Sequence, residues 1–206
     1  MLGLLGGTFD PIHVGHLRLA IEVRERIGLD EVWLMPAPRP RLRGVPEFDA
    51  DTRLRLLRAA VEGIDGLAVD AREMQIDGPT RTVDTLEAVR REQGARPVCL
   101  ILGADAAKRL DRWHRWERLI ELAHLVIARR PGASLPGDGP VADLIGRHRD
   151  ERDSALAGSA AGVVRVCDIP VLDISATAVR ERLASGRSIE FLVPPEVRQM
   201  LKNEDL

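Results

Sequence analysis

Two histidines and a run of small residues lie together near the start of the chain, in the stretch GGTFDPIHVGH. Gly6, Gly7 and Thr8 end a short apolar run, and His13 and His16 are spaced so that a helix would place both on one face. Glycines allow the backbone to approach a ligand closely, and the first N–H groups of a helix attract anions. The stretch therefore predicts a phosphate site that carries two histidines.

The spacing excludes the two commonest phosphate loops. Gly3, Gly6 and Gly7 do not fit the pattern G-x-G-x-x-G, and G-x-x-x-x-G-K-[ST] does not occur. A zinc site would need further ligands, and the remaining histidines, His114, His124 and His148, form no convincing cluster with the first pair. A tight turn followed by a helix with two surface histidines is the alternative that involves no chemistry.

Composition narrows the class of protein. A chain of 206 residues fits one domain, and a net charge of −2 argues against binding to a nucleic acid polymer. We expect no membrane span and no signal peptide, because no long apolar run and no basic leader with a cleavage site occur. Cys99 and Cys167 lie in separate apolar runs, which predicts buried free thiols. We expect a cytoplasmic protein, and a homo-oligomer stays open.

Short apolar runs alternate with amphipathic segments along the chain. Gly28 is the expected end of the first helix, and Asp49 or Asp51 is the expected N-cap of the second. The segment 132–162 resembles a loose surface connection with one short helix. We expect strands within 2–9, 31–37, 67–75, 97–105, 125–132 and 162–175, and helices within 14–28, 49–63, 80–94, 115–124, 175–186 and 194–204. This alternation predicts an α/β domain with a mostly parallel sheet.

Several motifs resemble those of one family. TFDPIHVGH matches the T/H-x-G-H signature of the nucleotidyltransferase superfamily, and later segments are similar to blocks of its nicotinate-nucleotide adenylyltransferase branch. The resemblance implies a Rossmann-like, doubly wound domain over residues 1–206, with a helical part from about 175 to 206 that closes over the triphosphate. The later segments are PAPRPRLRG, GPTRTVDTLEAV, LILGADAAKRLDRWHRWERL, VIARRPG and ISATAVRERLASGRSIEFLVPPEVRQML.

The activity that the resemblance implies is transfer of AMP from ATP to nicotinate mononucleotide, with release of pyrophosphate. Thr8, His13 and His16 would be the catalytic residues, and Mg²⁺ would be carried with the ATP. Capping is the alternative role for the polar residues at the helix starts, namely Asp105, Ser175 and Thr177. The implied ATP-binding residues are Gly6, Gly7, Arg43, Gly103, Asp105, Ser175, Thr177 and Arg180.

The acceptor is expected to bind to Arg81, Thr82, Thr85 and Trp113. Trp113 would stack on the pyridine ring, and a place in the core is its alternative role. For Thr82 and Thr85 the alternative is capping or a surface position. The chain departs from the family pattern at Arg81, at Ala176 and in the loop Pro40-Arg41-Leu42-Arg43. Two other functions therefore stay open: transfer to nicotinamide mononucleotide or another phosphorylated acceptor, and a non-catalytic nucleotide-binding module.

Overall fold

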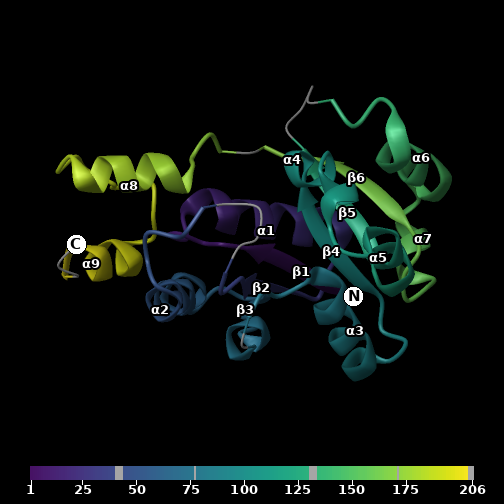
Figure 1. Cartoon of the computed structure of the whole chain (residues 1–206), viewed down its shortest axis with the longest axis horizontal. Helices are drawn as coiled ribbons and strands as arrows, with labels where there is room; N and C mark the ends of the chain where they lie inside the picture. Colours follow the sequence, from purple (N-terminus) through teal and green to yellow (C-terminus); the bar gives the residue numbers. More distant parts are fainter. Residues whose placement is uncertain (40–43, 77, 130–133, 171, 204–206) are drawn as a thin grey trace.

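The computed structural model describes the chain except residues 40–43, 77, 130–133, 171 and 204–206. Its centre is a parallel sheet in the order β3-β2-β1-β4-β5-β6 (Figure 1). Two halves thus extend outward from β1 and β4, which is the doubly wound arrangement that the sequence predicts. The strands are β1 (Leu2–Gly7), β2 (Glu31–Pro36), β3 (Leu67–Val69), β4 (Val98–Gly103), β5 (His124–Arg129) and β6 (Val164–Asp168).

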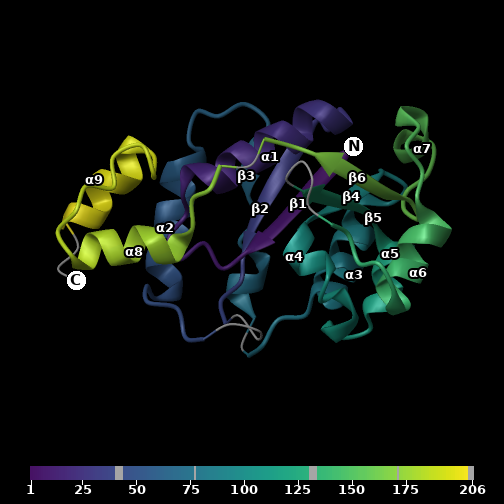
Figure 2. The ribbon, with the colours of Figure 1, turned by 90° about the horizontal axis from the view of Figure 1, so that it is seen from above.

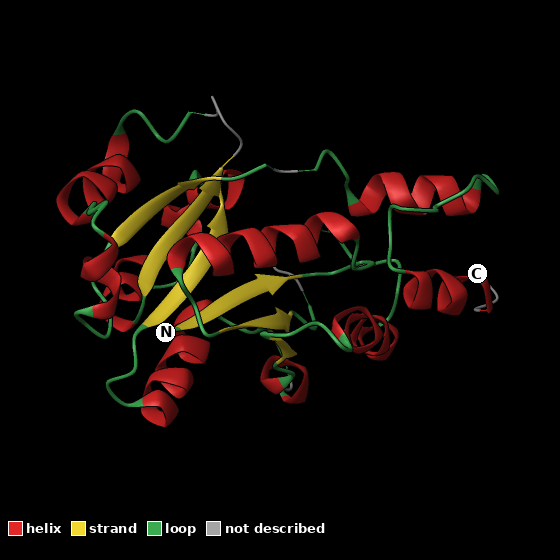
Figure 3. Cartoon of the chain, turned by 180° about the vertical axis from the view of Figure 1, so that it is seen from behind, coloured by secondary structure: helices red, strands yellow, loops and turns green. Residues whose placement is uncertain are grey.

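Helices cover both faces of the sheet. The helix α1 lies across one face, as Figure 3 shows, and packs there with α2, whereas α3, α5 and α6 cover the other face. The helices are α1 (Val14–Ile27), α2 (Ala50–Val61), α3 (Thr82–Gln93), α4 (Ala104–Ala107), α5 (Leu119–Leu122), α6 (Gly139–His148), α7 (Asp153–Ala157), α8 (Ala176–Ala184) and α9 (Pro195–Asn203). This layering gives the domain one hydrophobic core on each side of the sheet.

The alternation of side chains in β4 shows how the two cores share one strand. Cys99 and Ile101 belong to the core on the α1 side, and Leu100 and Leu102 belong to the core on the α3 side. Cys99 and Cys167 are both buried and free, as predicted. Burial raises the pKa of both thiols, which makes them poor nucleophiles.

The two halves of the sheet separate at its carboxyl edge. Pairing between β1 and β4 runs only from Leu2/Val98 to Leu4/Leu100, whereas β1 pairs with β2 along its whole length to Gly7. Strand order reverses between β1 and β4, and ligands of such sheets bind where it reverses. The fold therefore directs attention to the ends of these two strands.

The C-terminal helices lie beyond the sheet, beside α1 and α2 (Figure 2). Val179 of α8 and Val197 of α9 are fully buried in the core on the α1 side. The backbone N–H of Val14 donates to the carbonyl of Leu192, at 2.9 Å. The start of α1 is thus joined directly to the connection between α8 and α9.

Three expectations about local structure need correction. The third strand is only Leu67–Val69, followed by the 3₁₀ helix η1 (Arg72–Gln75), and the segment 115–124 divides into the 3₁₀ helix η3 (Trp116–Arg118) and the short α5. The described part of the segment 132–162 holds two helices, α6 and α7, where the sequence predicted one. Val141, Leu144 and Ile145 are buried, at the spacing that places them on one face of a helix.

Candidate active site

The loop after β1 follows from the packing of Phe9. This residue has a left-handed backbone with φ 48°, and its buried ring covers Gly7. A Cβ at Gly7 would lie only 2.8 Å from Phe9 Cζ, so a larger residue would displace the ring. Gly6 is exposed, and a Cβ there would meet nothing within 4 Å. The second glycine is therefore required by packing, whereas the first leaves the backbone open at the edge of the sheet.

The two histidines lie against each other at the start of α1. Their rings stack with centroids 3.7 Å apart, and the backbone N–H of His13 donates to His16 Nδ1 at 3.3 Å. An accepting Nδ1 places the proton of a neutral His16 ring on Nε2. Gly15 makes this packing possible, because a Cβ there would lie 3.0 Å from His13 Nδ1.

His13 is buried but not satisfied. The residue is only 5% exposed, and its Nδ1 has no hydrogen-bond partner among the described residues. Burial lowers the pKa of His13 to about 4, so the ring is neutral near neutral pH. A buried polar atom without a partner is uncommon in native structures, and His13 Nδ1 is such an atom in this loop.

The predicted C-terminal motif meets this loop. Arg180 Nη1 donates to the carbonyl of Asp10 at 2.5 Å and lies 3.3 Å from Asp10 Oδ2. Ser175 Oγ accepts the N–H of Ala178 at 3.1 Å, so it caps α8, and Thr177 is exposed. The structure therefore brings Arg180 to the motif, and it gives Ser175 the capping role that the sequence left open.

Sequence reasoning missed two buried charged residues here. The carboxylate of Asp10 accepts the N–H groups of Glu47 and Phe48, each at 3.0 Å. Arg53, in the first turn of α2, is only 1% exposed. Asp10 lies within the first motif, so its position in the sequence was a signal for a role at the site. Arg53 lies in an arginine-rich helix, and nothing in the sequence distinguishes it from the other arginines there.

The end of β4 carries the next pair of predicted residues. Gly103 is the residue before α4 and ends the strand, and Asp105 is exposed in the first turn of this helix. Asp105 is therefore not the N-cap of α4, which removes its alternative role. Both residues lie at the carboxyl edge, on the strand next to β1.

The expected acceptor residues form a second group around the start of α3. Arg81 Nη1 lies 3.0 Å from His114 Nε2, which joins this start to the segment that contains Trp113. Thr85 is buried and donates to Glu73 Oε1 at 2.7 Å, whereas Thr82 is half-buried. Trp113 is half-buried and packs against the core on the α3 side.

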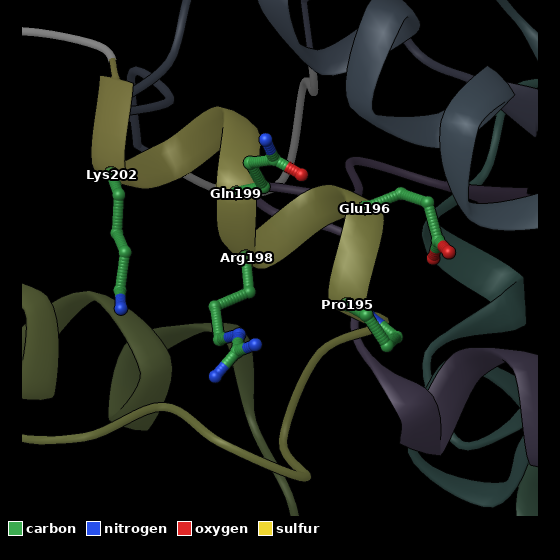
Figure 4. Close-up of a pocket in the computed structure, with 5 residues that line it drawn as sticks. All are labelled: Pro195, Glu196, Arg198, Gln199 and Lys202. Carbon is green, nitrogen blue, oxygen red and sulfur yellow. The ribbon is translucent and has the colours of Figure 1, made fainter.

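Four further observations concern the predicted site and the rest of the described chain. Arg43 lies outside the described residues. The described part contains no group of three or more His, Cys, Asp or Glu side chains placed to hold a metal ion, and none of its helices is long and apolar enough to cross a membrane. A pocket of about 250 Å³ on α9 is lined by Pro195, Glu196, Arg198, Gln199 and Lys202, none of which is a predicted site residue (Figure 4).

The fold and the paired histidines define a class, the nucleotidyltransferases. The family model described as cytidylyltransferase-like matches residues 4–182. The "probable nicotinate-nucleotide adenylyltransferase" of Pseudomonas putida strain W619 is 44% identical over 206 residues, which covers 100% of this chain and 94% of the relative. The protein of the same name from Methylococcus capsulatus strain Bath is 40% identical over 100% of this chain and 99% of its own. The chain belongs to the nicotinate-nucleotide adenylyltransferase family.

Solved structures agree on the fold. The nicotinic acid mononucleotide adenylyltransferase of Plasmodium falciparum, solved in complex with NaAD, superposes with a TM-score of 0.73. The match covers 100% of this chain and 96% of that chain, at 15% sequence identity. At this identity the likeness supports the sheet order and the placement of the helices, and it says nothing about individual side chains.

Proposed function

We propose that this protein transfers the adenylyl group of ATP to nicotinate mononucleotide in NAD biosynthesis. A phosphate oxygen of the acceptor attacks the α-phosphorus of ATP, the bond from that phosphorus to the oxygen bridging to the β-phosphate breaks, and pyrophosphate leaves with the bonding electrons. Nicotinate adenine dinucleotide is the second product. The observation that carries this proposal is the stacked pair His13–His16 at the end of β1, in a chain aligned over its full length with this family.

The chemistry needs no covalent intermediate, so positioning and charge neutralisation supply the catalysis. His16 would donate from Nε2 to a phosphate oxygen of ATP. His13 would use the nitrogen that has no partner in the described protein. Thr8, with the backbone of Gly6 and Gly7, would orient the α-phosphate from the end of β1.

The triphosphate would extend from this loop toward α8. Arg180 already lies at the motif through Asp10, so its guanidinium is close to where the β- and γ-phosphates would be. Thr177 and the first N–H groups of α8 would bind the same oxygens, and Ser175 would keep its capping bond. MgATP is the proposed substrate form, in which Mg²⁺ would neutralise part of the phosphate charge. The remaining contacts that we propose are Arg43 to the phosphates and Gly103 with Asp105 to the ribose.

The acceptor would bind between α3 and the Trp113 segment. Arg81, oriented by His114, would place a positive charge beside the nicotinate carboxylate or the phosphate, and Trp113 would stack on the pyridine ring. Thr82 has its hydroxyl at the start of α3. Thr85 donates to Glu73, so its hydroxyl would contact the acceptor through a lone pair or after exchanging this bond. We place the reaction in the cytoplasm.

Pyrophosphate release from MgATP tests the proposal, with nicotinate mononucleotide and nicotinamide mononucleotide compared at equal concentration. We expect a kcat/KM at least about tenfold higher for the nicotinate form, because a buried carboxylate contact contributes about 1.5–3 kcal/mol. Equal or reversed preference would favour the related transferase, and no release with either acceptor would refute the adenylyl transfer. The variant Arg81→Gln is the matched probe, since it should reduce the preference for the carboxylate more than it changes the KM for ATP.

A further inference from the structure

Arg53 makes an unusual set of bonds for a side chain on a helix. Its guanidinium donates to four backbone carbonyls and to no carboxylate among the described residues. The acceptors are Phe48 O from Nε at 3.1 Å, Thr8 O and Ala37 O from Nη1 at 2.7 and 2.8 Å, and Pro38 O from Nη2 at 2.8 Å. Four of the five N–H donors of the side chain are therefore used within the protein.

These carbonyls come from three separate segments of the carboxyl edge. Thr8 belongs to the loop after β1, Ala37 and Pro38 follow β2, and Phe48 precedes α2. The chain thus leaves the sheet at Pro38 and returns at Phe48, and Arg53 binds both points. Asp10 adds a second tie, because its carboxylate accepts the N–H groups of Glu47 and Phe48. These two side chains thus join the motif loop to Ala37 and Pro38 on one side and to Glu47 and Phe48 on the other.

The bond to Thr8 has a specific geometric consequence. The carbonyl of Thr8 belongs to the peptide bond before Phe9, the residue with φ 48°. A non-glycine residue in this region is strained and persists only when its surroundings hold it. The donor from Arg53 holds the peptide in the orientation that the strained residue requires. The direction in which the chain continues toward His13 therefore depends on this contact.

A second arginine provides a comparison within the same molecule. Arg90 of α3 also donates to four carbonyls: Leu122 O from Nε and Nη2 at 3.1 and 2.7 Å, Gly94 O and Arg96 O from Nη1 at 2.9 and 2.8 Å, and Ala160 O from Nη2 at 2.8 Å. All four precede strands β4, β5 or β6, at the amino edge. Arg90 therefore has the same bonding chemistry as Arg53 without contact to any predicted site residue.

We propose that Arg53 is a positioning residue for adenylyl transfer, which holds the loop Thr8–His13 in the geometry of reaction and couples it to Ala37, Pro38 and Phe48. This inference rests on the proposed function. It extends that function, because it assigns a kinetic role to a buried residue that touches no substrate. Lysine cannot replace the guanidinium, since one ammonium group cannot reach four carbonyls arranged around a planar fork.

The experiment compares Arg53→Lys with Arg90→Lys in the full chain. Both variants should lower the melting temperature. Only Arg53→Lys should lower kcat, by about 10- to 100-fold, with the KM for the acceptor changed by less than about threefold, because a small misplacement of reacting groups has effects of this size. A folded Arg53→Lys with kcat within about twofold of wild type would overturn the proposal. So would an equal loss of kcat in Arg90→Lys.

A double-mutant cycle with His16→Ala separates positioning from a general loss of stability. If Arg53 acts through the histidine loop, Arg53→Lys should reduce kcat by less than about threefold further once His16 is absent. A fully multiplicative loss would contradict the mechanism. Should Arg53→Lys fail to fold, Asp10→Asn weakens the second tie between the motif loop and Phe48 and is expected to lower kcat by about tenfold. An unchanged kcat in that variant counts against the proposal.

Hydrogen exchange keeps this inference separate from the proposed function. Backbone amides of residues 8–16 should exchange faster in Arg53→Lys than in wild type, and those of β4 and β5 should not. Arg90→Lys should leave residues 8–16 unchanged. If wild type transfers no adenylyl group, the proposed function fails, and this measurement still decides whether Arg53 holds the loop. Unchanged exchange in residues 8–16 would overturn the inference.

Discussion

The amino and carboxyl edges of the sheet both contain buried histidine and arginine side chains, but their hydrogen bonding differs. The buried histidines show this difference most directly. At the amino edge, His124 is fully buried; its Nε2 lies 2.9 Å from the carbonyl of Ser159, and its Nδ1 accepts the N–H of Val163 at 3.1 Å. At the carboxyl edge, His13 is almost as buried, yet its Nδ1 has no partner in the described protein. A histidine with both nitrogens used supports the fold, whereas one with a nitrogen to spare is available to a ligand.

The backbone segments bound by buried arginines also differ between the two edges. Arg90 closes the amino edge by binding carbonyls that directly precede strands. Arg53 binds carbonyls of loops, one of them next to the strained Phe9, and the pairing of β1 with β4 ends before the carboxyl edge is reached. Both ring nitrogens of His124 have partners at the amino edge, whereas His13 Nδ1 at the carboxyl edge has none among the described residues. The candidate site thus differs from the amino edge in two ways: it has an unsatisfied histidine nitrogen, and its loops are held by Arg53.

The largest effect that tests this comparison should come from His16→Ala. Loss of one hydrogen-bond donor to the developing charge should lower kcat by about 100-fold or more. His148 is the matched control, because it is also half-buried, and its Nδ1 lies 2.9 Å from the carbonyl of Gly162. We expect His148→Ala to keep kcat within about twofold. Steady-state kinetics of both purified variants give the answer, and near-normal turnover of His16→Ala would remove the catalytic role.

A smaller loss is expected from Gly15→Ala. The added Cβ would lie 3.0 Å from His13 Nδ1, so the His13 ring must move by a few tenths of an ångström, which disturbs its stacking on His16. We expect kcat to fall by about tenfold. Gly146→Ala in α6 is the control, since a Cβ there meets nothing within 4 Å and alanine favours a helix by up to about 1 kcal/mol. Gly15→Ala should therefore change mainly kcat, and Gly146→Ala should change mainly the thermal unfolding temperature. An unaffected kcat in Gly15→Ala would contradict the prediction, because it would show that the His13 ring accommodates the added Cβ without loss of function.

Much of this architecture follows from local sequence signals. The periodicity of α1 and its end at Gly28, which has φ 71°, were predicted. Of the two candidates for the N-cap of α2, Asp49 and Asp51, it is Asp49 that accepts the N–H of Thr52 at 2.7 Å. Such features are encoded within a few residues. The contact of Arg180 with the first motif was expected only because the family resemblance placed both segments at one triphosphate.

Other features could not be predicted from the sequence, because they depend on distant contacts. Arg53 is one arginine among several in α2, and only tertiary packing separates it from exposed Arg58 in the same helix. The apolar spacing in α6 was present in the sequence, but the surrounding glycines and prolines obscured it. The hydroxyl of Thr85 points to Glu73, a partner 12 residues away that no motif contains. Burial of a charge or hydroxyl is decided by such partners.

The smallest effect concerns stability against pH. Burial lowers the pKa of His13 from 6.5 to about 4, so the unfolded chain binds the extra proton first as the pH falls. The free energy of unfolding should therefore decrease by about 1 kcal/mol from this residue between about pH 6.5 and 5.5. His13→Asn should remove that part of the slope, measured by urea unfolding at the two pH values. The same slope in His13→Asn and wild type would contradict the assignment.

His124 sharpens the same measurement. Burial also lowers its pKa, so His124→Gln should remove its own part of the pH slope. The two histidines should differ once MgATP is present. A phosphate bound at His13 favours the charged ring and raises its pKa toward the ordinary value, which flattens the slope contributed by that residue. The contribution of His124, at the other edge of the sheet, should stay as it is. If MgATP changes both contributions equally, the unsatisfied nitrogen of His13 does not face the triphosphate.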